Sequence, residues 1–85
     1  MLEKEPDDLF LNFALGLEYL NDATTLSLAE QQFQFVLSQD KNYIAAYYQL
    51  GKFYEAGNKK SEALEIYNMG LIKAKEQKNN ELTKL

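Results

Sequence analysis

Carboxylates, lysines and tyrosines are the side chains that could perform chemistry in this chain, because its 85 residues contain no His and no Cys. General acid–base or nucleophilic catalysis would therefore depend on these groups. Each cluster of them has a structural explanation instead: two acids at a helix start, two on an exposed helix face, and three lysines at the basic end of a helix. We therefore expect no catalytic residues and no enzyme. The clusters are Asp7 and Asp8, Glu62 and Glu65, and Lys73, Lys75 and Lys78.

Metal and cofactor sites are not indicated either. Asp7, Asp8 and Asp22 lack the regular loop spacing of a calcium-binding EF-hand. The absence of Cys removes disulfides and thiolate ligands. We expect no bound metal and no cofactor.

Length and charge limit the class of partner. Eighty-five residues form a single domain, residues 1–85, with an ordinary hydrophobic fraction of 46%. The net charge of −4 and the pI near 4.7 argue against a nucleic acid partner, which needs a basic field. The first five residues lack the apolar segment of a signal peptide, and no run reaches the roughly 18 apolar residues of a membrane span. These features predict a cytoplasmic protein with no membrane partner.

Charge is unevenly distributed between the two halves. Residues 1–42 hold eight acids and two lysines, whereas residues 43–85 hold five acids and seven lysines. One interpretation is electrostatic complementarity between two copies arranged head to tail. The other interpretation is that these charges lie on solvent-exposed faces and that their uneven distribution has no function.

The elements that must position these residues are helices. Pro6 suits a first helical position, which predicts a helix from there to about Asn21. The Asx- and Thr-rich residues 21–25 predict a turn. A second helix over about 26–39 would be capped by Thr25, or by Ser27 in a capping box with Glu30.

The second half shows the same order. Asn42 is expected to cap a third helix from about Tyr43 to Ala56, which Gly57-Asn58 would end in a left-handed conformation. A fourth helix should run from about Lys60 to Lys78, with an interruption at Asn79-Asn80. Residues 81–85 would then be a further helix start or a frayed end.

The two halves are near-duplicates. Leu15-Gly16-x-x-Tyr19 returns as Leu50-Gly51-x-x-Tyr54, and Ala29-x-x-x-Phe33 returns as Ala63-x-x-x-Tyr67. The offsets are 35 (50 − 15) and 34 (63 − 29), so the first copy has one extra residue in its turn. A period of about 34 with these residue types is the signature of a helix-turn-helix repeat. At these positions the sequence resembles the tetratricopeptide repeat family.

The resemblance implies an all-α, right-handed α-α superhelix of two antiparallel helical hairpins. Repeat one would cover about 9–43, repeat two about 44–77, and a short C-terminal cap about 78–85. Gly16 and Gly51 would allow close helix approach. The six Tyr and five Phe could form a base-stacking platform, but their helical spacing and the acidic balance favour a core. The predicted core residues are Leu15, Tyr19, Phe33, Val36, Tyr47, Leu50, Tyr54 and Tyr67.

The family presents the first helix of each hairpin on a concave groove and binds other proteins there. The first helix here is apolar around most of its circumference, with Leu11, Leu15 and Tyr19 expected to meet the second helix. On the remaining face of this helix, the predicted partner-binding residues are Phe10, Phe13, Leu17 and Leu20. The corresponding helix of the second copy, about 43–56, adds Tyr48, Lys52 and Glu55, and the seven residues are hereafter called the first-helix surface.

Three occupants of this surface are possible: a helix or extended peptide of another protein, a second copy in a homodimer, or the C-terminal segment of the chain itself. The leading hypothesis is an interaction module that binds a protein or peptide in an apolar groove, with Lys52 and Glu55 setting polar specificity. The alternative is a structural homodimer that uses the same face.

Overall fold

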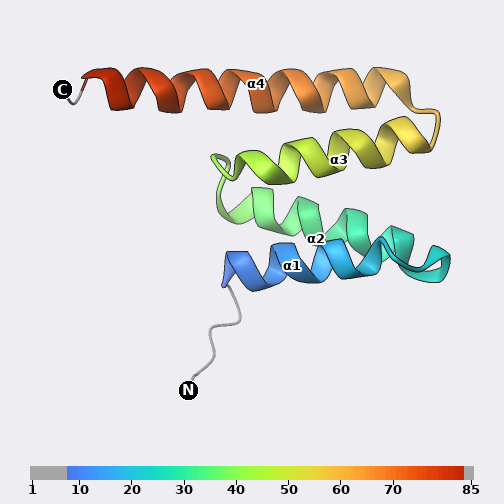
Figure 1. The fold of residues 1–85 in the computed structure, drawn as a ribbon. Coiled ribbons are helices and arrows are strands. Elements are labelled where there is room, and N and C mark those ends of the chain that lie inside the picture. The colour runs from blue at the N-terminus through green and yellow to red at the C-terminus, as the bar shows by residue number, and fades with distance from the viewer. Residues whose placement is uncertain (1–7, 84–85) are drawn as a thin grey trace.

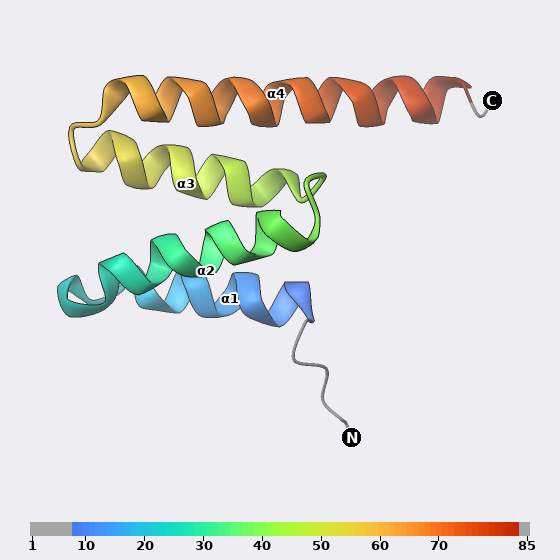
Figure 2. The same cartoon turned by 180° about the vertical axis from the view of Figure 1, so that it is seen from behind.

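Four antiparallel helices follow one another across a flat molecule (Figure 1). The computed structural model describes residues 8–83. The helices are α1 (Leu9–Tyr19), α2 (Leu26–Gln39), α3 (Ile44–Ala56) and α4 (Lys60–Thr83), with a short 3-10 turn η1 (Ala23–Thr25). α2 packs against α1 and α3, and α3 packs against α4, as the reverse view also shows (Figure 2). The molecule measures 47 × 41 × 17 Å, and the predicted all-α fold of two helical hairpins is confirmed.

The first helix ends earlier than the predicted Asn21. It begins at Leu9 because Asp8 is the N-cap, and the Asp8 carboxylate accepts a hydrogen bond from the Leu11 N–H at 3.2 Å. The predicted start at Pro6, with Asp7 beside it, lies outside the described residues. At the other end, the N–H groups of Leu20 and Asn21 donate to carbonyls three residues back. This tighter pattern ends the α-helix at Tyr19.

The extra residue of the first copy is absorbed in the predicted turn. The Asp22 carboxylate accepts hydrogen bonds from both the N–H and the Oγ1 of Thr24, each at 2.9 Å. Thr25 takes the N-cap position of α2, but its hydroxyl donates to the Tyr19 carbonyl at 2.7 Å instead of capping the helix. Ser27 lies inside α2, whose bounds agree with the predicted 26–39.

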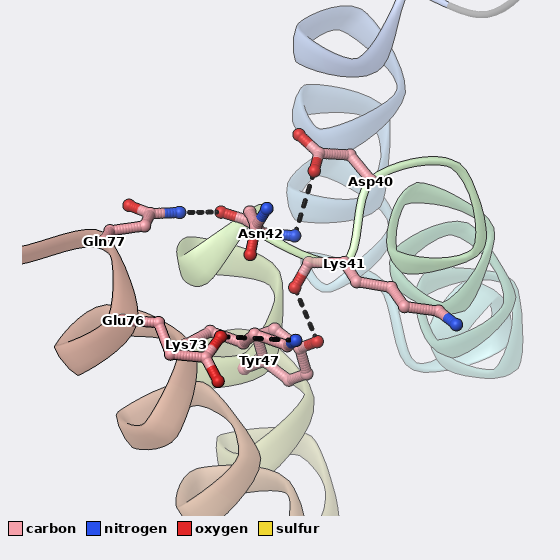
Figure 3. Close-up of polar contacts among 7 residues, drawn as sticks. All are labelled: Asp40, Lys41, Asn42, Tyr47, Lys73, Glu76 and Gln77. Carbon is pink, nitrogen blue, oxygen red and sulfur yellow. Dashed lines mark hydrogen bonds and ion pairs between the residues drawn. The ribbon is translucent and has the colours of Figure 1, made fainter. Parts of the chain in front are cut away.

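Side-chain hydrogen bonds hold the connection between the two hairpins (Figure 3). The Asp40 carboxylate accepts from the Asn42 N–H at 2.9 Å, so Asp40 shapes this turn. Tyr43, and not the predicted Asn42, is the N-cap residue of α3. Tyr47 on α3 donates its hydroxyl to the Lys41 carbonyl at 2.7 Å, and Gln77 on α4 donates to the Asn42 carbonyl at 2.8 Å. The turn is thereby tied to both helices of the second hairpin.

Asn58 makes the left-handed stop between α3 and α4, with φ of 64°, whereas Gly57 keeps a negative φ. α4 then continues to Thr83, so the interruption predicted at Asn79-Asn80 is wrong. Asparagine costs only about 0.7 kcal/mol relative to alanine inside a helix. Moreover, good helix formers occupy residues 74–78, where the first copy has the turn at 40–42.

The core lies along the middle of the layer. Its buried apolar residues are Ala29, Phe33, Val36, Ala46, Tyr47, Leu50 and Ala63. Most predicted core positions are confirmed, with Tyr19, Tyr54 and Tyr67 half-buried.

The prediction for Leu15 is wrong, because its side chain is 40% exposed, whereas Leu50 at the same repeat position is 1% exposed. Leu11, also predicted to meet the second helix, is exposed as well. α3 lies between α2 and α4, but α1 is at the edge of the described layer (Figure 1). The neighbouring helices, and not the local motif, therefore decide whether this leucine is buried.

Candidate functional site

The first-helix surface divides into exposed and packed residues. Phe10 is 69% exposed and Tyr48 is 55% exposed, and Leu17, Lys52 and Glu55 also reach solvent. Phe13 and Leu20 are half-buried and pack against the core cluster of Ala29, Phe33 and Leu50. The exposed members can contact a partner directly, whereas Phe13 and Leu20 also contribute to the packing of the hairpin.

Phe13 has a structural role at the junction of the two copies. Its ring centroid lies 5.5 Å from that of Phe33 on α2 and 5.3 Å from that of Tyr43 before α3. Aromatic pairs at this separation and tilt are favourable beyond the area they bury. Phe13 therefore links the first hairpin to the second.

One cavity, hereafter the large cavity, lies where the end of α1, the start of α2 and the last turns of α3 meet. It has a volume of about 510 Å³, within the range of ligand-binding clefts. Leu20 and Lys52 from the predicted surface both line it, so the structure brings these two together from different hairpins. The other lining residues are Leu26, Glu30, Gln49, Phe53, Tyr54, Ala56, Gly57 and Lys59.

Sequence reasoning missed these other residues because it considered only one face of each first helix. Leu26 and Glu30 come from the start of α2, which no argument from the first helices would include. The sequence nevertheless contained a signal for Leu26, because this apolar residue directly follows a polar turn. Its side chain forms part of the cavity wall.

A hydrogen-bonded group spans the cavity wall. Tyr54 donates its hydroxyl to the Glu30 carboxylate at 2.8 Å and accepts from Gln34 Nε2 at 3.2 Å. Partial burial, followed by the hydrogen bond to Glu30, raises the pKa of Tyr54 above its ordinary value. These contacts join α2 to α3 and fix the Glu30 carboxylate at the cavity.

Lys52 and Glu55 are each engaged by a tyrosine. The Lys52 ammonium lies 5.2 Å from the centroid of the Tyr48 ring, a cation–π distance. Glu55 accepts a hydrogen bond from the Tyr67 hydroxyl at 3.0 Å, and burial followed by this hydrogen bond raises the pKa of Tyr67. Glu55 is therefore directed toward α4.

Two smaller cavities lie between α3 and α4. One of about 240 Å³ is lined by Tyr48, and one of about 180 Å³ by Glu55, with Tyr67 shared between them. Phe10, Phe13 and Leu17 line none of these three cavities. The predicted residues are thus divided: Leu20, Tyr48, Lys52 and Glu55 line cavities, and the other three do not.

Within residues 8–83, no group of three or more acidic side chains is arranged to hold a metal ion. No helix in the same range has both the length and the apolar character to cross a membrane.

Comparison with known proteins places the fold. No protein-family model and no curated protein matches the chain. Among solved structures, the chain is similar to a tetratricopeptide repeat domain protein from Salinibacter ruber, determined by solution NMR. The two are 33% identical with a TM-score of 0.79, and the match covers 86% of this chain and 73% of that one.

Proposed function

This chain belongs to the tetratricopeptide repeat family, a fold of protein-interaction modules, and we propose that it binds a helical or extended peptide along the first helices of its two hairpins. The large cavity carries this proposal, because Leu20 of the first hairpin and Lys52 of the second line it together. A peptide seated there would contact both repeats at once.

The exposed apolar residues supply the affinity. Phe10, Leu17 and Tyr48 are exposed on the first helices, and Phe53 lines the large cavity. Full burial of one such side chain contributes about 1.5–3 kcal/mol before the cost of association. Two to four of them would support binding in the micromolar range.

The polar residues at the cavity indicate the chemistry of the partner. Lys52 and Lys59 both line it, whereas the Glu30 carboxylate is hydrogen-bonded by Tyr54. An apolar anchor with an acidic neighbour would fill the cavity and meet the two lysines. The peptide would therefore combine an aromatic or aliphatic side chain with a nearby carboxylate.

Selection from a random displayed peptide library tests this function. Peptides selected on the wild-type chain should be enriched in apolar residues with nearby acids, and Ala56→Trp should abolish their binding by filling the cavity from its exposed edge. Leu64→Ala on α4 is the control, because Leu64 is exposed and does not line this cavity. Selected peptides that bind Ala56→Trp as tightly as wild type would place the binding site elsewhere.

A homodimer through the same first-helix surface is the second candidate, favoured by the exposed Phe10 and Leu17 on α1. Charge weighs against a symmetric pairing of this kind. Residues 8–40 carry five acids and no lysine, so two α1 faces would bring like charge together. Sedimentation at increasing concentration tests the dimer, and a second copy bound in this way would block selection of peptides at the cavity.

A further inference from the structure

The two ends of the helix layer carry apolar surfaces that lie outside the large cavity. At one end, Leu11 is 52% exposed and Leu15 is also exposed on α1. Adding the repeat offset of 35 gives Ala46 and Leu50, which are buried on α3. We call Leu11 and Leu15 the α1 end face. It corresponds to the part of α3 that packs on the first hairpin.

At the other end, the cavity of about 240 Å³ forms a groove on α3 and α4, here called the end groove. Tyr67, Gly70 and Leu71 line it from α4. Subtracting the repeat offset of 34 gives Phe33, Val36 and Leu37, which belong to the buried or half-buried part of α2. Leu71 is 54% exposed, whereas its equivalent Leu37 packs against the core.

The contact between the two hairpins therefore shows how the α1 end face of one molecule would fit the end groove of another. α3 packs against α2 at the junction of the hairpins, and Tyr43, just before α3, lies against Phe13 of α1. Phe13 corresponds to Tyr48, which lines the end groove (13 + 35 = 48). The end groove is therefore formed by residues of α3 and α4. Their equivalents in the first copy, on α1 and α2, are the residues that contact the second hairpin.

We propose that the occupant of the end groove is α1 of a second copy of this chain, with its Leu11 and Leu15 seated against Leu71 and its neighbours. This head-to-tail contact would repeat, between two molecules, the junction of the two hairpins within one. The end groove shares no residue with the large cavity, which lies at the opposite ends of α1 and α3, although Tyr48 of the first-helix surface lines the end groove. Each contact also leaves one α1 end face and one end groove free for further copies.

Charge complementarity favours this occupant over a symmetric pairing. Residues 8–40 hold five acids and no lysine, whereas residues 41–79 hold seven lysines and four glutamates. Lys73 and Lys75 follow Leu71 on α4, and Lys73 pairs with Glu76 at 3.6 Å on the same helix (Figure 3). A head-to-tail contact brings the acidic first hairpin against the basic second hairpin. Salt should weaken such a contact and strengthen a symmetric α1–α1 dimer.

Two variants of the full chain block one end each. Leu11→Lys places a cation on the α1 end face and leaves the end groove intact, while Leu71→Lys places a cation in the end groove and leaves the α1 end face intact. The two altered ends then repel each other and cannot pair in the mixture. Both side chains are exposed, so folding should be retained, which circular dichroism would verify. Sedimentation from about 1 to 200 µM measures the association of each variant alone and of their mixture.

The expected pattern is specific to head-to-tail packing. The wild-type mass should rise beyond a dimer with concentration, and each variant alone should associate at least about tenfold more weakly. Their equimolar mixture should form a dimer and stop there, because only one intact α1 end face and one intact end groove remain per pair. Raising the salt concentration should weaken the wild-type association.

Other outcomes overturn the proposal. If Leu71→Lys associates like wild type while Leu11→Lys does not, the contact is a symmetric α1 dimer. A wild-type chain that stays monomeric up to about 200 µM, or a mixture that stays monomeric, also rejects it. Ala56→Trp separates this contact from the peptide site, because it should abolish peptide selection and leave self-association unchanged.

Discussion

Gly51 on α3 lies directly against the ring of Tyr67 on α4, and a Cβ atom at residue 51 would overlap the Cε1 atom of that ring. The first hairpin repeats the relationship, because a Cβ at Gly16 would lie 2.6 Å from Cε1 of Phe33. In each hairpin a glycine on the first helix receives an aromatic ring from the second. This pair of contacts sets the distance between the helices.

Replacing Gly51 by leucine should therefore unfold or strongly destabilise the domain. The added side chain must displace the Tyr67 ring, and overpacking of this kind costs about 1–3 kcal/mol or more. Urea unfolding followed by circular dichroism measures the change. Gly57→Ala is the matched control, because Gly57 has a negative φ and a Cβ there would be 3.6 Å from the nearest atoms. Equal stability of Gly51→Leu and wild type would contradict the observed contact.

Leu50→Ala and Leu15→Ala form a second matched pair, at the same position of the two repeats. Leu50 is buried between the hairpins, so its truncation should cost about 2–5 kcal/mol of unfolding free energy. Leu15 is exposed, and its truncation should cost less than about 1 kcal/mol when measured on dilute protein. Similar losses at both sites would show that α1 is covered in the dilute chain.

Asp22 should make stability depend on pH in the acid range. The hydrogen bond from the Thr24 N–H, followed by that from its hydroxyl, lowers the pKa of Asp22 below its ordinary 3.8. A lowered folded-state pKa contributes stability that is present above 3.8 and is lost as the pH falls through the folded pKa. Asp22→Asn keeps an acceptor without the charge, so its stability relative to wild type should improve as the pH falls through this window. Thermal unfolding of both proteins across that range provides the measurement, and parallel curves would exclude the effect.

Tyr54 should act at the opposite end of the pH scale. Burial and the hydrogen bond to Glu30 raise its pKa, so its contribution to stability is complete below the ordinary value of 10.0 and is lost as the pH rises through the folded pKa. Tyr54→Phe removes the ionising group together with its hydrogen bond. The stability difference between wild type and Tyr54→Phe should shrink above about pH 10, as measured by urea unfolding. A constant difference from neutral to alkaline pH would mean that Tyr54 ionises equally in both states.

Much of the fold could be predicted because its signals are local. The bounds of α2 and the position of the extra residue in the first turn agree with the structure, since polar turn residues and helical periodicity act over a few residues. The end of α4 was mispredicted for a local reason as well. The prediction overestimated how strongly asparagine disfavours the helix at Asn79 and Asn80.

The candidate site was harder to predict because a cavity depends on elements distant in the sequence. Leu20 and Lys52 belong to different hairpins, and they share a cavity only because α1, α2 and α3 meet there. Phe13 was predicted as a contact residue, and its packing against Phe33 and Tyr43 depends equally on the arrangement of the two hairpins.

The sequence by itself determined the two repeats, their helices and the glycines that let those helices approach. Only the tertiary structure decided that Leu50 is buried and Leu15 is exposed, although both stand in the same Leu-Gly-x-x-Tyr motif. The physical reason is that a motif fixes which way a side chain points from its helix. Burial depends on whether another helix lies in that direction.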